Sequence, residues 1–267
     1  MERLGGVAGV QVVITEVPNR KTVRVEAFCE KEADAQLIAR AFGGQVRAVK
    51  MQNWAALAPE PNKPILVGDK LVVCDAATKT QIRQAHKEFP GREVVAIPAE
   101  LAFGTGHHAT TESVLRLIAG VAKQHLKAGK SWTVCDLGCG TGILGIAARK
   151  LGAASVWGCD FDPLAVKVAR TNIERNQVAG TTFVQKDVLK WKPGRQWDCV
   201  LANIFYDVLT AAFPTIVSAV KPGGTLIVSG ILKSHADDCL KAGEAAGITW
   251  DRRLTRLNKW VTAIGYR

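Results

Sequence analysis

Hydrophobic residues in the second half of the chain follow two patterns that alternate. Nearly continuous apolar runs predict buried strands at 132–137, 155–160, 181–185, 197–204 and 225–231. Apolar residues at helical spacing predict helices between and after them, at 143–152, 163–177, 207–220 and 236–247. Two more strand-like runs close the chain, around 248–255 and 258–266. Repeated strand–helix units with apolar strands predict an α/β fold, in which helices cover both faces of a mainly parallel sheet.

The first part of the chain has a different order of elements. Alternating apolar residues predict strands at 10–17 and 22–28, joined by a turn at PNRK. A helical pattern at 33–43 ends at a glycine, and a further strand-like run follows at 45–51. This order predicts a small sheet with a helix on one face.

A proline-rich stretch separates these two patterns. MQNWAALAPEPNKP carries three prolines in a short span, which is typical of a linker. We therefore expect a small N-terminal α+β domain over 1–51, a linker over 52–63, and a larger α/β domain over 64–267.

Composition fits such a two-domain protein and narrows its class. The 267 residues suit a larger plus a smaller domain, and no apolar run approaches the ~18 residues of a membrane span. The first residues lack the apolar core of a signal peptide, so we expect a cytoplasmic location. Seven scattered cysteines without a C-x-x-C pair argue against a disulfide framework or a zinc site. Cys135, Cys159 and Cys199 lie in predicted strands and are expected in the core.

The formal net charge of +11 leaves two interpretations open. Basic residues are spread from Arg3 to Arg267 without a long basic run or an aromatic RNA-binding signature. They form either an ordinary solvated surface or a surface attracted toward ribosomal RNA.

The stretch VCDLGCGTG, residues 134–142, carries the most informative motif. Counted from Gly138 the glycines form G-x-G-x-G, and counted from Gly140 they form G-x-G-x-x-G, the fingerprint of dinucleotide-binding folds. Asp160 ends the next predicted strand, 22 residues after Gly138 and 20 after Gly140. An acid there binds ribose hydroxyls, so this spacing fits a dinucleotide and an adenosyl cofactor equally.

Two features favour the adenosyl cofactor. Asp136 lies just before the turn, where an acid suits an ammonium or sulfonium group better than a pyrophosphate. A dinucleotide would also place two phosphate charges near the helix start, yet the turn has no basic residue before Arg149. We therefore expect the turn to bind S-adenosylmethionine.

Longer motifs resemble one protein family. LAFGTGHHATT (101–111), the glycine turn with its flanks (134–163), LANI (201–204) and KPGGTLIVSGIL (221–232) resemble the PrmA family, methyltransferases of ribosomal protein eleven of the large subunit. The resemblance covers roughly residues 64–267. It implies a Rossmann-like class I methyltransferase domain with a seven-stranded sheet, preceded by a small substrate-recognition domain.

The resemblance also implies cofactor-binding residues. Phe103 and Thr111 would lie against the cofactor from the loop before the glycine turn, and the backbone of Gly138 and Gly140 would contact its methionine moiety. The remaining contacts would come from strand ends: Asp160 on the ribose, Asp187 on the adenine amine, and Asn203 near the methionine amine and the transferable methyl group.

Two further features of the sequence are the aromatic residues after Asn203 and a pair of adjacent histidines. NIFYD places Phe205 and Tyr206 after Asn203, where the family usually has Ile-Leu-Ala; these rings either attract a cationic group or pack the next helix onto the sheet. His107 and His108 are adjacent, which does not suit a shared metal, so we expect no metal site.

The resemblance implies transfer of methyl groups to lysine side-chain amines and an N-terminal amine of the ribosomal protein. We expect direct displacement with no assigned general base, in a monomer that needs neither a membrane nor a stable nucleic-acid partner. Other hypotheses remain: a methyltransferase of another protein, RNA or a small molecule, a nicotinamide-dinucleotide oxidoreductase, or a catalytically silent cofactor-binding protein.

Overall fold

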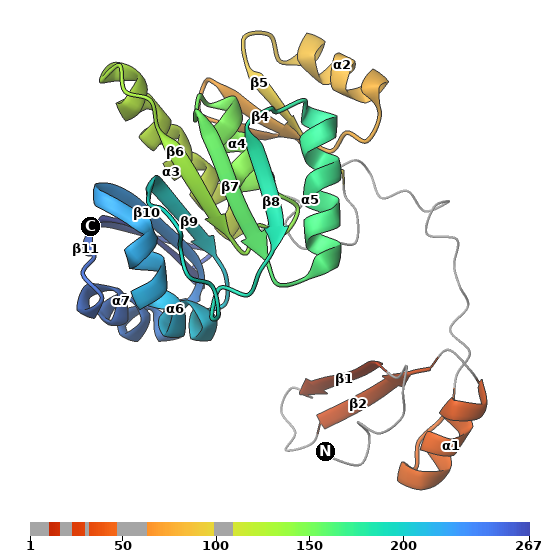
Figure 1. Ribbon diagram of the computed structural model, residues 1–267. Helices are drawn as coiled ribbons and strands as arrows, with labels where there is room; N and C mark the ends of the chain where they lie inside the picture. Colours follow the sequence, from red (N-terminus) through yellow and green to blue (C-terminus); the bar gives the residue numbers. More distant parts are fainter. Residues whose placement is uncertain (1–10, 17–22, 30–31, 47–62, 99–108) are drawn as a thin grey trace. The chain divides into compact units, whose positions relative to one another are not determined.

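A computed structural model describes residues 11–16, 23–29, 32–46, 63–98 and 109–267 (Figure 1). The chain divides into two compact units, residues 1–58 and 59–267. Within the described residues, no helix combines the length and apolar character that crossing a membrane requires.

The smaller unit contains a hairpin and a helix. Strands β1 (Gln11–Glu16) and β2 (Val23–Phe28) pair antiparallel, and helix α1 (Glu32–Phe42) follows them. These three elements confirm the first two predicted strands and the predicted helix. Most of the strand predicted at 45–51, and nearly all of the predicted linker, lie outside the described residues.

The larger unit is built on a seven-stranded sheet in the order β11-β12-β10-β9-β6-β7-β8. Its strands are β6 (Thr133–Leu137), β7 (Ser155–Asp160), β8 (Thr181–Gln185), β9 (Trp197–Asn203), β10 (Val220–Leu232), β11 (Thr249–Arg256) and β12 (Trp260–Tyr266). The five strands β6 to β10 run parallel to one another, and β12 is antiparallel to both of its neighbours. The predicted seven-stranded, mainly parallel sheet is confirmed.

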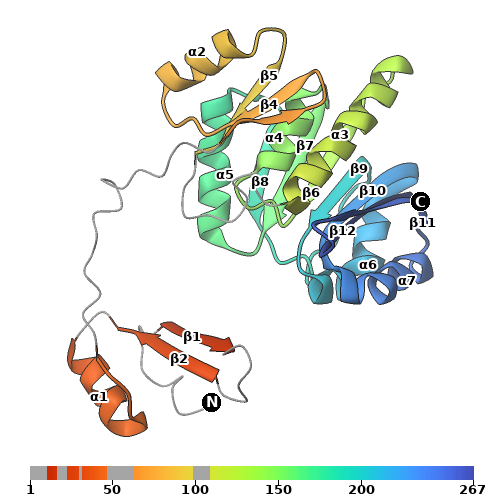
Figure 2. The same cartoon turned by 180° about the vertical axis from the view of Figure 1, so that it is seen from behind.

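Helices cover both faces of this sheet, as Figures 1 and 2 show. One face carries α3 (Ala109–Lys127), α4 (Ile143–Lys150) and α5 (Pro163–Asn176). The other carries α6 (Tyr206–Ala219) and α7 (Ala236–Ala245), which follows the short 3-10 turn η1 (Lys233–His235). Each face has its own buried apolar cluster, so both faces of the strands are apolar. The three cysteines expected in the core are buried, with at most 1% exposed.

Helix α3 was not among the expected elements. We assigned Thr111 to a loop, but the structure begins a helix of 19 residues at Ala109 and places Thr111 inside it. Val114, Leu115 and Ile118 lie on its buried side, at the spacing of a helix that packs against a sheet.

A second, three-stranded sheet in the same unit packs against helices α3, α4 and α5. It consists of β3 (Ile65–Val67), β4 (Leu71–Cys74) and β5 (Glu93–Ala96), with α2 (Lys79–Glu88) between the last two. The side chain of Asn176 in α5 fixes it in place, because its amide bonds both the N–H and the carbonyl of Ala96 at 2.7 and 2.9 Å.

Candidate active site

A cavity of about 1250 Å³ opens at the carboxyl ends of the parallel strands. The chain runs outward from β6 through β7 to β8 and then returns to β9 on the other side of β6, so the strand order reverses between β6 and β9. Ligands in such sheets bind at this switch point. Residues at or just after the ends of β6, β7, β8 and β9 line the cavity, among them Gly138, Gly140, Asp160, Asp187 and Asn203.

The glycine turn after β6 is tied to the end of β7. The N–H groups of Gly138 and Cys139 both donate to the carbonyl of Cys159, at 2.8 and 3.0 Å. Gly138 and Gly140 have φ angles of 68° and 53°, a region that glycine enters without the strain of a Cβ. Their backbone therefore forms a bare section of the cavity wall.

The later glycines of the turn serve the protein interior. A Cβ built at Gly142 would lie 2.7 Å from the ring of Phe183, and one built at Gly145 would lie 3.0 Å from it. Phe183 is a fully buried residue of β8. The G-x-G-x-x-G spacing is thus explained by the close packing of α4 over this ring.

Asp160 supports the turn and faces the cavity. Its Oδ2 accepts a hydrogen bond from the N–H of Gly140 at 2.9 Å, and its Oδ1 accepts one from Asp162 at 3.1 Å. Each carboxylate oxygen can accept a second hydrogen bond. Since Asp160 also lines the cavity, these remaining positions are available for ribose hydroxyls.

We expected Asp136 to contact the cofactor directly. Instead it lies beneath the turn and is not part of the cavity wall. It is fully buried, and its Oδ2 accepts a hydrogen bond from the N–H of Gly145 at 2.9 Å. Its Oδ1 has no hydrogen-bond partner among the described residues. Burial raises the pKa of Asp136 to about 7, with a smaller contribution from Asp160, while the Gly145 N–H opposes the rise.

The cavity also extends past the ends of β9 and β10. Asn203, Ile204 and Phe205 line it there, together with Gly230, Trp260 and Thr110. Asn203 is the last residue of β9 and pairs with Ser229 of β10. The side chain of Asn203 makes no hydrogen bond within the described part of the chain, which leaves its amide available to a ligand.

The two aromatic residues after Asn203 have different surroundings. The side chain of Phe205 is 69% exposed at the cavity, so it does not pack α6 onto the sheet. Tyr206 stacks on His235, with ring centroids 4.1 Å apart and planes 5° from parallel. The packing alternative that we considered therefore does not hold for Phe205, whereas Tyr206 has a partner within the fold.

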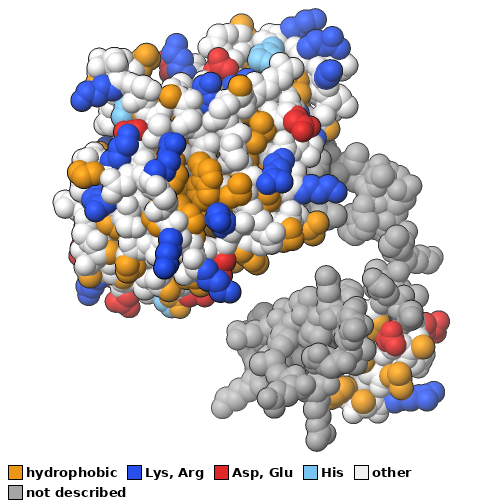
Figure 3. Space-filling model, in the orientation of Figure 1, with side chains coloured by type: hydrophobic (Ala, Val, Ile, Leu, Met, Phe, Trp, Pro, Cys, Tyr) orange, Lys and Arg blue, Asp and Glu red, His pale blue; other side chains and the backbone are white. Residues whose placement is uncertain are grey.

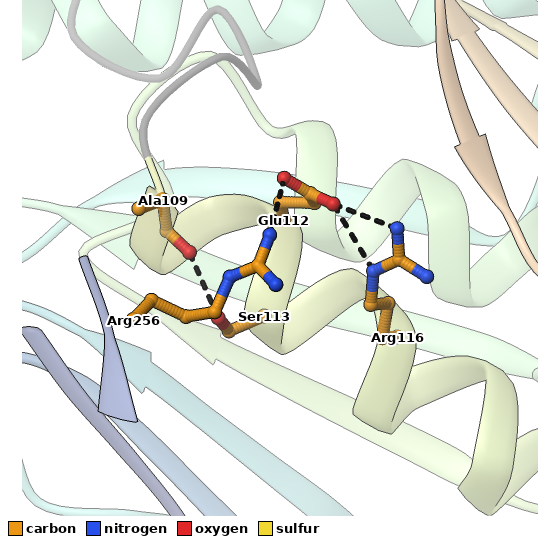
Figure 4. A network of polar contacts seen from close by, with 5 residues as sticks. All are labelled: Ala109, Glu112, Ser113, Arg116 and Arg256. Carbon is orange, nitrogen blue, oxygen red and sulfur yellow. Dashed lines mark hydrogen bonds and ion pairs between the residues drawn. The ribbon is translucent and has the colours of Figure 1, made fainter. Parts of the chain in front are cut away.

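The start of α3 brings Thr110, rather than the expected Thr111, to the cavity wall. Figure 4 shows how this turn of the helix is held: Glu112 binds Arg116 one turn later at 2.7 Å and Arg256 of β11 at 3.2 Å. The hydrogen bond to Arg116 is the main cause that lowers the pKa of Glu112. The carboxylate therefore stays ionised and links α3 to the edge of the sheet.

Asp187 lies after β8, as expected, and lines the cavity. Its Oδ1 accepts a hydrogen bond from the N–H of Leu189 at 3.0 Å, which fixes the turn around Val188. Several apolar residues of the wall nearby were not predicted from the sequence: Phe161, Leu164, Val188 and Leu189. Their position after strand ends was the available signal, and their apolar surface suits an adenine ring.

Other predicted residues lie elsewhere or outside the described residues. Phe103, His107 and His108 belong to the undescribed stretch 99–108. Among the residues that the structure describes, no group of three or more His, Cys, Asp or Glu side chains could hold a metal ion. Lys and Arg side chains are spread over the face drawn in Figure 3, with Asp and Glu among them.

The strand order, the antiparallel β12, the glycine turn and Asp160 together define a class I methyltransferase that uses S-adenosylmethionine. A family model described as ribosomal protein L11 methyltransferase (PrmA) matches residues 9–267. The chain therefore belongs to the ribosomal protein L11 methyltransferase family.

Individual relatives are consistent with this assignment. A ribosomal protein L11 methyltransferase of Pelotomaculum thermopropionicum is 38% identical over 80% of this chain and 67% of its own length. One of Agrobacterium fabrum is 33% identical over 96% of this chain and 89% of its own length. Among solved structures, a ribosomal protein L11 methylase of Lactobacillus delbrueckii subsp. bulgaricus is similar with a TM-score of 0.62 and 25% identity, over 76% of this chain and 98% of the other.

Proposed function

We propose that this protein methylates amines of ribosomal protein L11, both lysine side chains and the N-terminal amine. The observation that carries the proposal is the position of Asn203 and the exposed Phe205 ring at one end of a cavity whose other end holds Asp160 and Asp187. Such a cavity has room for an adenosyl cofactor and for an acceptor side chain. The names of the relatives support L11 as the substrate.

When bound, S-adenosylmethionine supplies a methyl group on a positively charged sulfur, which a neutral amine can attack. A lysine amine has an ordinary pKa of about 10.4 and must lose its proton first. Burial of the amine in the cavity, away from water, lowers that pKa. The main contribution of the protein is to hold the amine in line with the methyl group.

Asn203 and Phe205 are the residues we propose for this positioning. The amide oxygen of Asn203 accepts a hydrogen bond from the amine. This bond orients the lone pair of the amine nitrogen toward the methyl group of the cofactor. The face of the Phe205 ring attracts the amine while it still carries its charge. No general base is assigned, because the acids of the cavity wall follow β7 and β8, on the far side of β6 from Asn203.

We propose the N-terminal unit as the part that recognises the substrate. It is a compact unit of its own, with a hairpin and a helix. A protein substrate needs a docking surface beyond the amine pocket, because one side chain offers little specificity.

Mass mapping of the product tests the acceptor type. Purified L11 and ribosomal RNA are incubated with the enzyme and isotopically labelled S-adenosylmethionine. L11 is then cleaved and analysed for labelled residues, and the RNA is analysed for label. The proposal predicts label on lysine residues and on the N-terminal amine. Label on arginine, glutamine or histidine would contradict the amine proposal but keep L11 as the substrate. Label only on added ribosomal RNA would contradict both parts.

A further inference from the structure

Ile204, the residue after Asn203, lies between two glycines, one in the turn after β6 and one in β10. A Cβ built at Gly138 would lie 2.2 Å from Cγ2 of Ile204. One built at Gly230 in β10 would lie 2.4 Å from the carbonyl oxygen of Ile204 and 3.0 Å from its carbonyl carbon. All three distances are shorter than the roughly 3.5–4.0 Å of a favourable contact between two carbon atoms. Each glycine therefore leaves a space that Ile204 occupies.

Gly230 itself lies at an irregularity of β10. The pairing of β10 with β12 shifts register between Val228 and Ile231, and the pairing with β9 ends at Ser229 and Asn203. Gly230 has a φ of 86°, which lets the strand bend at this point. Such bulges commonly redirect a strand beside an active site.

A buried hydrogen bond holds this bulge from the other side. The hydroxyls of Ser229 and Thr262 lie 2.6 Å apart, and both side chains are at most 1% exposed. The bulge is thus fixed to β12 on one side and touches the backbone of Ile204 on the other. Because the interior is closely packed, neither β12 nor the backbone of Ile204 can move easily to accommodate a larger side chain at Gly230.

We infer that Gly230 is a positioning residue for methyl transfer: together with Gly138 it clamps Ile204 and so fixes Asn203 at the acceptor end of the cavity. The inference rests on the proposed function, which places the acceptor beside Asn203. The adenosine end, around Asp160 and Asp187, lies on other strands, so the clamp acts on turnover more than on cofactor affinity.

The chain offers a matched control for the test. Gly223 is also in β10 and has a φ of 73°, but a Cβ there would meet no atom within 4 Å. Gly223→Ala therefore adds a similar backbone strain without the contact to Ile204. We expect Gly230→Ala to lower kcat at least about tenfold, with the Kd for S-adenosylhomocysteine changed less than about threefold. Gly223→Ala should leave both values near those of the unmodified protein.

The two contacts with Ile204 give a second, more specific test. Gly138 faces the side chain of Ile204, whereas Gly230 faces its backbone. Ile204→Ala removes Cγ2, so it should partly restore the turnover of Gly138→Ala and should not restore that of Gly230→Ala. Full activity of Gly230→Ala, or equal restoration of both variants, would overturn the clamp.

A spectroscopic measurement keeps the inference separate from the proposed function. In protein labelled with ¹⁵N-asparagine, the side-chain amide signal of Asn203 is assigned by its loss in Asn203→Ala. The clamp predicts that Gly230→Ala shifts this signal and that Gly223→Ala does not. An unshifted signal in Gly230→Ala would contradict the clamp, whereas an unmodified protein that fails to methylate L11 would contradict only the proposed function.

Discussion

The carboxylate of Asp160 is bonded to the backbone of Gly140: Oδ2 accepts the Gly140 N–H at 2.9 Å. The bond joins the end of β7 to the glycine turn after β6, the neighbouring strand. The same acid thus shapes the turn and presents its remaining lone pairs to the cavity. We therefore propose that Asp160 binds the cofactor, so that cofactor affinity and local stability are coupled at this residue.

This coupling predicts the effect of Asp160→Ala. Loss of the charged acceptor should weaken S-adenosylhomocysteine binding by on the order of 1.5–3 kcal/mol. It also leaves the Gly140 N–H without its partner, which should lower the free energy of unfolding by about 1–3 kcal/mol. Calorimetry and denaturant unfolding measure the two effects. Asp251→Ala, which removes an exposed acid of β11, serves as the control and should change neither. Unchanged binding in Asp160→Ala would assign the ribose contact to another residue.

The raised pKa of Asp136 predicts that the stability of the protein depends on pH. Its folded pKa of about 7 lies above the ordinary aspartate value, so the folded state holds this proton more tightly than the unfolded state. Protonated Asp136 therefore stabilises the folded state fully below about pH 4, and this stabilisation is lost as the pH rises toward and through about 7.

The variant Asp136→Asn isolates this contribution, because an amide oxygen can still accept the Gly145 N–H and carries no charge. The free energy of unfolding of the unmodified protein should fall relative to that of the variant as the pH rises from about 5 to about 8, by at most roughly 1.4 kcal/mol per pH unit. Denaturant titrations at several pH values measure the difference. A constant difference would mean that Asp136 does not change its protonation in this range.

The two-unit organisation predicts separable functions. A chain that begins at Pro59 keeps every described residue of the cavity wall. It should bind S-adenosylhomocysteine with an affinity within about threefold of the full chain, and it should lose methylation of L11. Calorimetry and transfer of labelled methyl groups measure these properties. Undiminished methylation by the shortened chain would place substrate recognition in the larger unit.

The sheet and most helices could be predicted because burial on both faces gives each parallel strand a nearly continuous apolar run, as in 197–203. Helix α3 could not be placed as easily. It begins at Ala109, inside the motif AFGTGHHATT, whose glycines and threonines are typical of a loop, and it contains Gly120. Its apolar spacing at Val114, Ile118 and Val121 was the usable signal.

The sequence indicates that the acids lie at strand ends, but it does not indicate what their side chains contact. The sequence places both Asp136 and Asp160 at strand ends, yet only Asp160 reaches the cavity. Asp136 instead bonds the first turns of α4, because the strand turns its side chain toward that helix. The contact of Ile204 with Gly138 and Gly230 brings together the ends of β9 and β6 with β10, and it has no local sequence signal.

The most direct test of the proposed methyl transfer compares the activity of Asn203→Ala with that of the unmodified protein. The amide of Asn203 is the polar group of β9 at the acceptor end, and it makes no hydrogen bond within the described residues that folding would lose. Purified protein and variant are given labelled S-adenosylmethionine and L11, and transfer is measured alongside thermal unfolding without cofactor. We expect the unmodified protein to label L11. The variant should turn over at least about tenfold more slowly, equal to about 1.4 kcal/mol of barrier, with an unchanged unfolding temperature. Equal turnover per folded molecule, with lowered stability, would contradict the proposed role of Asn203.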